Sequence, residues 1–272
     1  MIKLGFIGAG HMGEALLRGL LTSGMCRKDQ IIVSDINQER LRVMSSSYGV
    51  NTTSNNKDLL KRSNVVILAV KPDAIDRVLS EIKGLLTPGK ILISIAAGIT
   101  TSIISKKIMK KVKLVRAMPN TPALVLMGAT VLYFNPLLNQ KERELVTRIF
   151  ESVGTVDLVE NEKLLDAVTG LSGSGPAFAA MFIEALSDGG VKMGLTKGVA
   201  LRLAAQTVYG TAKLVLERGL HPAEFRDTVS SPAGTTIEGV HQLELYGFRG
   251  SVISAVESAA LRSKELSKGE YR

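Results

Sequence analysis

Tryptophan is absent from this 272-residue sequence, and aromatic residues make up only 4% of it. Proteins commonly stack single-stranded nucleic acid on aromatic side chains, so such a binding platform is not expected here. The single cysteine, Cys26, excludes an intrachain disulfide and a cysteine-based metal cluster. The three histidines, at positions 11, 221 and 241, are too scattered to favour a histidine metal site. We therefore expect no bound metal.

Long hydrophobic runs are missing as well. The sequence contains no stretch of about 18 apolar residues that could cross a membrane. Its apolar N-terminal run leads into glycines and not into the small-residue cleavage site of a signal peptide. A lone cysteine also fits a reducing compartment. These absences predict a cytoplasmic protein with no membrane partner.

Charge of one sign is in excess, with a formal net charge of +9. A basic surface can attract nucleic acid, but it can equally attract an anionic small molecule. The lysine run between residues 106 and 113 has no interleaved aromatic residue and matches no nucleic-acid motif. We interpret it as the solvated face of a helix and expect no nucleic-acid partner.

A glycine motif near the N-terminus carries the first functional signal. Residues 2–7 form a short apolar run, and Gly8-Ala9-Gly10-His11-Met12-Gly13 follows, after which apolar residues recur at helical spacing. This order of strand, G-x-G-x-x-G turn and helix is the dinucleotide-binding fingerprint. The first glycine permits the tight turn, the second lets the backbone approach a pyrophosphate, and the third lets helix and strand pack closely.

Alternating strands and helices continue through the first half of the chain. Apolar runs predict strands over residues 30–35, 64–70, 90–95, 112–117, 129–134 and 155–159, with a helix over residues 140–152. The nearly all-apolar run 64–70 is typical of a parallel sheet that is buried on both faces. The sequence thus predicts an α/β fold with a Rossmann-type domain over residues 1–157.

Asp35 ends the second predicted strand, about 20 residues after the last glycine of the motif, where an acid binds the ribose 2′-hydroxyl of NAD. The same carboxylate would repel the 2′-phosphate of NADP. Neighbouring polar and basic residues soften this argument: Ser34, Asn37, Arg40, Asn55 and Asn56. The choice between NADPH and NADH therefore stays open. Lys71 follows another strand, at the edge where such sheets bind ligands.

After about residue 160 the strand–helix alternation stops. Long helices are predicted over residues 196–217 and 250–268, and another follows Pro176. The helix after Pro176 and the helix over residues 196–217 are apolar on nearly all sides. This predicts that both are buried, within the domain or between subunits. We expect an all-helical dimerisation and substrate domain over residues 158–272.

A loop rich in hydroxyl groups precedes a helix near the C-terminus: Val229-Ser230-Ser231-Pro232-Ala233-Gly234-Thr235-Thr236. Serine and threonine are natural N-caps, so a side-chain cap is expected at this helix start. A helix N-terminus also presents unpaired N–H groups and a positive dipole end, which favour a carboxylate or a phosphate.

Several segments together resemble the pyrroline-5-carboxylate reductase family. They are residues 5–10, 69–72 (Ala-Val-Lys-Pro), 96–98, 118–122 (Met-Pro-Asn-Thr-Pro), 170–177 (Gly-Leu-Ser-Gly-Ser-Gly-Pro-Ala), 188–195 and 229–237, in family order and across essentially the whole chain. The resemblance implies a homodimer with interlocked helical domains and an active site at the dimer interface, and larger rings of dimers occur in the family. It implies reduction of 1-pyrroline-5-carboxylate to L-proline by NADPH or NADH, the last step of proline biosynthesis.

The resemblance also assigns residues. It places the substrate against Glu162, Ser231, Gly234, Thr235 and Thr236, with the Thr236 hydroxyl facing the ring nitrogen as an orienting and catalytic group. Two departures from the family pattern stand in the same loop, where Thr228 and Ala233 replace residues that are often Asn and Gly. The cofactor is expected to contact Gly8, Ala9, Gly10, His11, Met12, Asp35, Asn37, Asn56, Ala69, Val70, Lys71, Pro72 and Ala97.

Two other functions share part of this pattern. A 3-hydroxyacid dehydrogenase has a similar first half but uses a lysine on the first long helix of its second domain. Here the helix after Gly175 has no lysine before Lys192, which disfavours that function. A nucleotide-sensing protein without turnover would share the glycine loop, but it has no need for the loop from Ser231 to Thr236.

Overall fold

The computed structural model describes residues 2–268. In this part of the chain, contacts divide the protein into two compact units. The first comprises residues up to Ser174 together with Ser258 onward, and the second comprises Gly175–Glu257. The predicted boundary between residues 157 and 158 falls earlier than this division. The difference arises because the segment after residue 158 packs on the sheet through α7 (Leu164–Val168).

The first unit contains a single sheet, with strand order β3-β2-β1-β4-β5-β6-β7-β8. All neighbouring strands are parallel except β6 and β7, which are antiparallel. Reversal of the strand order on the two sides of β1 is the arrangement of a doubly wound nucleotide-binding sheet. The strands are β1 (Leu4–Ile7), β2 (Ile31–Ser34), β3 (Asn51–Thr53), β4 (Val65–Leu68), β5 (Ile91–Ser94), β6 (Lys113–Met118), β7 (Gly128–Phe134) and β8 (Gly154–Leu158).

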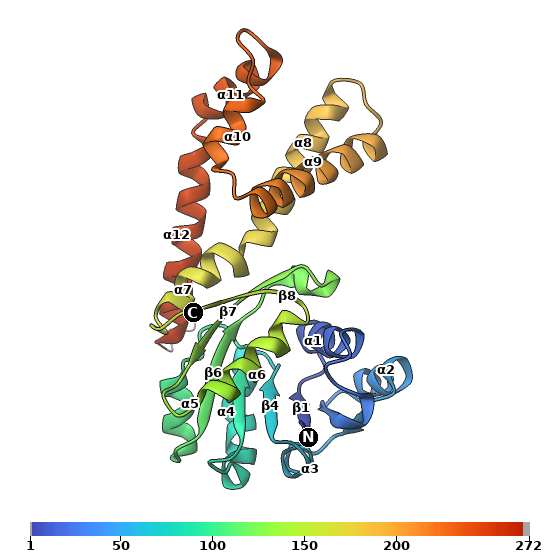
Figure 1. Ribbon diagram of the computed structural model, residues 1–272, viewed down its shortest axis with the longest axis vertical. Coiled ribbons are helices and arrows are strands. Elements are labelled where there is room, and N and C mark those ends of the chain that lie inside the picture. Colours follow the sequence, from blue (N-terminus) through green and yellow to red (C-terminus); the bar gives the residue numbers. More distant parts are fainter. Residues whose placement is uncertain (1, 269–272) are drawn as a thin grey trace. The chain divides into compact units, whose positions relative to one another are not determined.

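Helices cover both faces of this sheet (Figure 1). Besides α7, they are α1 (His11–Thr22), α2 (Gln38–Tyr48), α3 (Asn56–Arg62), α4 (Pro72–Ile82), α5 (Thr101–Ile108) and α6 (Gln140–Glu151). Short 3₁₀ turns occur at Lys28–Gln30, Lys83–Leu85 and Thr121–Val125, and a π turn occupies Thr169–Gly173.

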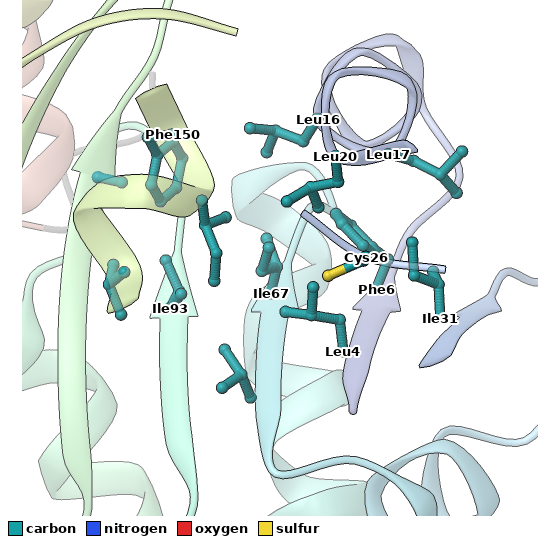
Figure 2. Packing of buried hydrophobic residues seen from close by; sticks show 14 of the residues in the cluster. Leu4, Phe6, Leu16, Leu17, Leu20, Cys26, Ile31, Ile67, Ile93 and Phe150 are labelled. Carbon is teal, nitrogen blue, oxygen red and sulfur yellow. The ribbon is translucent and has the colours of Figure 1, made fainter. Parts of the chain in front are cut away.

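Successive residues of each strand point to opposite faces, so the strands feed two separate hydrophobic clusters. Figure 2 shows Leu4 and Phe6 of β1 and Ile67 of β4 beside Leu16 of α1 and Phe150 of α6. Side chains of α2 belong to the same cluster. The alternate residues of the same strands pack against α3, α4 and α5 on the other face. The predicted α/β fold with an N-terminal Rossmann-type domain is confirmed.

The second unit is entirely helical in the described residues, as predicted. Its principal contact is between α8 and α9, and the rings of Phe182 on α8 and Phe248 on α12 lie 5.7 Å apart. The helix α12 begins in this unit and ends in the first, where its last turns contact Gly98. The helices are α8 (Gly175–Lys192), α9 (Lys197–Arg218), α10 (Pro222–Thr228), α11 (Thr235–Leu245) and α12 (Phe248–Ser267).

Candidate functional site

The glycine turn between β1 and α1 is built so that a ligand can approach the backbone. Gly8 has a φ of +107°, and a Cβ atom added there would lie 2.5 Å from the carbonyl oxygen of Ala69. Gly13 lies so close to Gly8 that its own added Cβ would be 2.8 Å from the Gly8 carbonyl oxygen. An atom added at Gly10 would meet open space. Gly8 and Gly13 are therefore required by close packing of the turn, and Gly10 leaves open space beside the backbone.

The helix α1 starts at this turn without a side-chain cap. Its N-cap is Gly10, whose backbone is extended and which has no side chain to accept a hydrogen bond. The N–H groups of the first turn of an α-helix have no intrahelical acceptor. Together with the dipole, they form a site for a negatively charged group such as a pyrophosphate. His11 and Met12 occupy this first turn.

A cavity of about 410 Å³ lies beside the turn, at the carboxyl ends of β1, β2 and β4. The residues of α4 that close its other side, Arg77 and Glu81, were not among the predicted site residues. Their only sequence signal is polar spacing at i and i+4 on the face opposite the apolar stripe of α4. Seven predicted cofactor residues line this cavity: Gly8, Gly10, Asp35, Asn56, Ala69, Val70 and Lys71.

Other predicted cofactor residues support the turn or lie outside this cavity. Ala9 is buried, and the side chain of Asn37 caps α2 by accepting hydrogen bonds from the N–H groups of Glu39 and Arg40. Pro72 is the first residue of α4 and lines a neighbouring cavity with Ile75 and Leu79. Ala97 follows β5 and is half-buried.

Asp35 is fixed at the end of β2 by two backbone groups. The Ala9 N–H donates to its Oδ2 at 2.6 Å, and the Asn37 N–H donates to its Oδ1 at 2.8 Å. Both carboxylate oxygens keep free lone pairs, so each can accept one more hydrogen bond. This geometry suits a ribose hydroxyl as a donor and opposes a second negative charge.

Arg40 supports the glycine turn from α2. Its Nε donates to the Ala9 carbonyl oxygen at 2.8 Å, and its guanidinium pairs with Glu14 of α1 at 2.5 Å. Tyr48 donates to the other oxygen of Glu14 at 2.8 Å. Burial alone would raise the pKa of Glu14, but the hydrogen bonds from Arg40 and Tyr48 outweigh it and hold that pKa below its ordinary value.

Glu162 belongs to a second polar cluster in the same unit. Its two carboxylate oxygens accept hydrogen bonds from the N–H and the hydroxyl of Thr101, both at 2.6 Å. Arg116 of β6 lies 3.7 Å from Glu162 and 3.6 Å from Asp166 of α7. Asp166 also accepts a hydrogen bond from Ser263 of α12 at 2.8 Å. Glu162 thus connects the start of α5, directly after the loop that carries Ala97, to the buried Arg116.

The hydroxyl-rich loop before α11 lies in the second compact unit. The expected side-chain cap is absent among the described residues, and this prediction was wrong: the N-cap of α11 is Gly234, which has no side chain. An added Cβ at Gly234 would overlap the Ser231 hydroxyl, which occupies that space. The first-turn N–H groups of Thr235 and Thr236 are consequently left for another acceptor.

Two backbone details qualify this loop. The Gly234 N–H donates to the Ser231 carbonyl oxygen at 3.0 Å, so it is already used in a turn. Ala233, one of the two departures from the family pattern, has a φ of +54°. This left-handed conformation costs a residue with a Cβ roughly 1–2 kcal/mol and favours glycine. The neighbouring Thr228 hydroxyl donates to the Phe225 carbonyl oxygen within α10.

Three observations bear on alternative functions. The helix α8 has its one lysine at its last residue, Lys192, so it offers no acid–base lysine of the hydroxyacid dehydrogenase kind. Among the described residues, no helix is both long enough and apolar enough to traverse a lipid bilayer. The same residues contain no group of three or more His, Cys, Asp or Glu side chains that could hold a metal ion.

Known proteins resemble this chain over almost its whole length. Residues 162–266 match a family model described as pyrroline-5-carboxylate reductase dimerisation, and residues 3–98 match one described as NADP oxidoreductase, coenzyme F420-dependent. A pyrroline-5-carboxylate reductase of Methanosarcina acetivorans is 44% identical over 98% of both chains. The solved structure of such a reductase from Coxiella burnetii has a TM-score of 0.92 at 37% identity, and covers 98% of each chain. That of the Plasmodium falciparum pyrroline carboxylate reductase, with NADP bound, has a TM-score of 0.88 at 34% identity over 98% of each chain.

Proposed function

Because the chain belongs to the pyrroline-5-carboxylate reductase family, we propose that it reduces 1-pyrroline-5-carboxylate to L-proline with NADH or NADPH. This reaction is the last step of proline biosynthesis. The observation that carries the proposal in this chain is the start of α11, where no side chain caps the helix and Ser231 lies against Gly234. A carboxylate is a natural acceptor for the N–H groups left unpaired there.

The cofactor end of the site fits a dinucleotide. At Gly10 no side chain stands between the backbone and a pyrophosphate, and α1 presents uncapped N–H groups to it. Asp35 accepts from the adenosine ribose, and Val70, Lys71 and Ala97 lie along the path to the nicotinamide. When bound, NADH or NADPH supplies the hydride for the imine carbon. The protein's contribution is binding and alignment.

The substrate end requires binding more than acid catalysis. A protonated imine is already an electrophile, so a site without a catalytic His or Lys is sufficient for hydride addition. The carboxylate of the substrate binds Ser231 and the N–H groups of Thr235 and Thr236, and the Thr236 hydroxyl orients the ring nitrogen. Gly234 acts by leaving space for Ser231, because its own N–H is already engaged. Both carboxylate oxygens of Glu162 accept hydrogen bonds from Thr101. Glu162 therefore acts on the substrate side indirectly, by holding Thr101 in place.

A homodimer follows from the family and fits the second unit. In the single chain, large apolar side chains of α8 and α9 are exposed, including Met181, Leu203 and Leu216. Extensive exposed apolar surface marks a protein–protein interface. These helices are therefore buried between subunits. We further propose that dimers assemble into a ring and that the enzyme acts in the cytoplasm.

The reaction is tested by following the oxidation of NADH and of NADPH with 1-pyrroline-5-carboxylate as substrate. Thr236→Ala removes the assigned hydroxyl and should lower kcat/KM at least tenfold, a loss of about 1.4 kcal/mol in transition-state binding. Thr235→Ala is the matched control, since it keeps the backbone N–H and removes a hydroxyl with no assigned role. Equal kcat/KM values for wild type and Thr236→Ala would contradict the site assignment.

A further inference from the structure

A chain of three polar side chains closes the adenosine end of the cofactor cavity. The Ser34 hydroxyl, at the end of β2, donates to Oδ1 of Asn56 at 2.7 Å. Nδ2 of Asn56, at the start of α3, donates to Oε2 of Glu81 at 2.7 Å. All three residues line the cavity beside Asp35. Glu81 comes from the last turn of α4, far in sequence from the glycine motif.

These two hydrogen bonds decide what the cavity offers to a ligand. The Ser34 hydroxyl has one proton, which it gives to Asn56, and one Asn56 amide proton goes to Glu81. The groups that remain for the ribose 2′ position are mainly acceptors: lone pairs of Ser34, the Glu81 carboxylate and the Asp35 carboxylate. A 2′-hydroxyl can donate to such acceptors, whereas a 2′-phosphate would face two negative charges.

Two cations lie near these three side chains and, without the Glu81 carboxylate, would favour the 2′-phosphate of NADPH. Arg77 lies one turn before Glu81 on α4 and also lines the cavity, as does Lys71. Neither side chain forms an ion pair with the described residues that could already satisfy it. An arginine guanidinium is well suited to bind a phosphate group. Asp73 also lines the cavity, but it lies in the first turn of α4, whereas Glu81 lies in the last turn and is hydrogen-bonded to Asn56. The carboxylate of Glu81 is therefore the group on α4 that opposes a 2′-phosphate at this end of the cavity.

We infer that Glu81, acting directly and through Asn56, is a specificity-determining residue that makes the protein favour NADH over NADPH. The inference rests on the proposed function, because it assumes that a nicotinamide dinucleotide occupies this cavity. It adds a second acidic residue to Asp35. Removal of either charge should improve the binding of NADPH relative to NADH.

Glu81→Gln tests this with little change of shape. Kd values for NADH and NADPH are measured by the fluorescence of the reduced cofactor on the full-length protein, without substrate and at constant ionic strength, because salt screens such charges. We expect the ratio of the NADPH Kd to the NADH Kd to fall about tenfold, the effect of roughly 1.4 kcal/mol. Adding Arg77→Gln to Glu81→Gln should reverse most of this fall, since the arginine then no longer meets the phosphate.

Asp76→Asn is the matched control on the same helix. Its carboxylate pairs with Lys107 at 2.6 Å and lines a different cavity, so the Kd ratio should stay at the wild-type value. An unchanged ratio in Glu81→Gln, or an equal fall in Asp76→Asn, would overturn the inference. Because binding is measured without 1-pyrroline-5-carboxylate, the Kd ratio tests Glu81 even if the wild-type protein does not reduce that imine. Failure of that turnover would instead refute the proposed function.

Discussion

Replacing Arg116 by methionine should destabilise the first unit strongly, although Arg116 forms only long ion pairs. Its side chain is 3% exposed, and its guanidinium lies 3.7 Å from Glu162 and 3.6 Å from Asp166. Those carboxylates are 17% and 15% exposed. Methionine keeps much of the volume, so the change mainly removes the charge and leaves two mostly buried carboxylates without a cation.

The expected size follows from two opposing terms. At an effective dielectric constant of about 20, two unit charges 3.6 Å apart attract by roughly 4–5 kcal/mol, and desolvation of the guanidinium offsets much of this. Removing one partner of a buried ion pair typically costs about 3–5 kcal/mol. Glu162 and Asp166 keep their hydrogen bonds from Thr101 and Ser263, which favours the lower end of that range. We therefore expect a loss of about 3 kcal/mol for Arg116→Met.

Urea unfolding followed by circular dichroism measures this loss, with the protomer concentration held fixed because dimerisation contributes to stability. Arg62→Met is the control: Arg62 lies 3.5 Å from Asp58, but both side chains are nearly half exposed. Removing such a surface pair should cost about 0.5 kcal/mol or less. If Arg116→Met also lost less than about 1 kcal/mol, the argument from burial would be refuted.

A triple variant separates the unpaired charges from the lost contacts. Combining Arg116→Met with Glu162→Gln and Asp166→Asn leaves no unpaired charge in the cluster. Replacing every member of a buried ionic group is often nearly neutral, unlike removing one member. The triple variant should therefore recover most of the stability lost in Arg116→Met. A triple variant less stable than the single one would show that packing or hydrogen bonding, and not charge, holds this cluster together.

Three further changes test the two ends of the site. Ala233→Gly should raise the free energy of unfolding by up to about 1 kcal/mol, because glycine adopts the left-handed conformation without strain. The greater freedom of glycine in the unfolded chain offsets part of this gain. A lower melting temperature would contradict the prediction. Gly234→Ala should raise KM for 1-pyrroline-5-carboxylate at least tenfold with little effect on the Kd of NADH, since the new methyl group displaces Ser231; parallel changes in both constants would point to general unfolding. The depressed pKa of Glu14 means that its pairing with Arg40 stabilises the fold above about pH 4.5 and loses that effect as the pH falls through the folded-state pKa. The melting-temperature gap between wild type and Glu14→Gln should thus narrow on acidification, and a gap that widens would contradict the sign.

Strong local signals explain how much of the fold could be predicted from the sequence. Most buried strands are mainly apolar runs that end at a glycine, a proline or a polar loop, so their presence along the chain follows from the sequence. The edge strand β3 (Asn51–Thr53) was not predicted, because its polar residues are partly exposed and form no apolar run. Its pairing with β2 is a tertiary effect that a local pattern does not reveal.

The candidate site also has parts that a local sequence pattern predicts and parts that depend on tertiary packing. Contiguous motifs identified the glycine turn and the loop before α11, since each has its residue types at fixed spacing. Glu81 and Arg77 enter the cofactor cavity only because α3 and α4 pack side by side. The cluster of Arg116 with Asp166 depends on β6, α7 and α12, which are distant in sequence. A sequence pattern can indicate which residue types are present, but the folded sheet decides which of them meet.

The start of α11 shows why a failed local prediction can still indicate function. A serine or threonine cap would stabilise this helix by about 1 kcal/mol, yet the hydroxyl-rich loop places Gly234 at the cap and lets the Ser231 side chain lie beside it. Ala233 adds left-handed strain of similar size directly before it. Two local costs at one loop are expected where a backbone is shaped for a ligand and not for stability. The N–H groups that a cap would have satisfied are those that we assign to the carboxylate of the substrate.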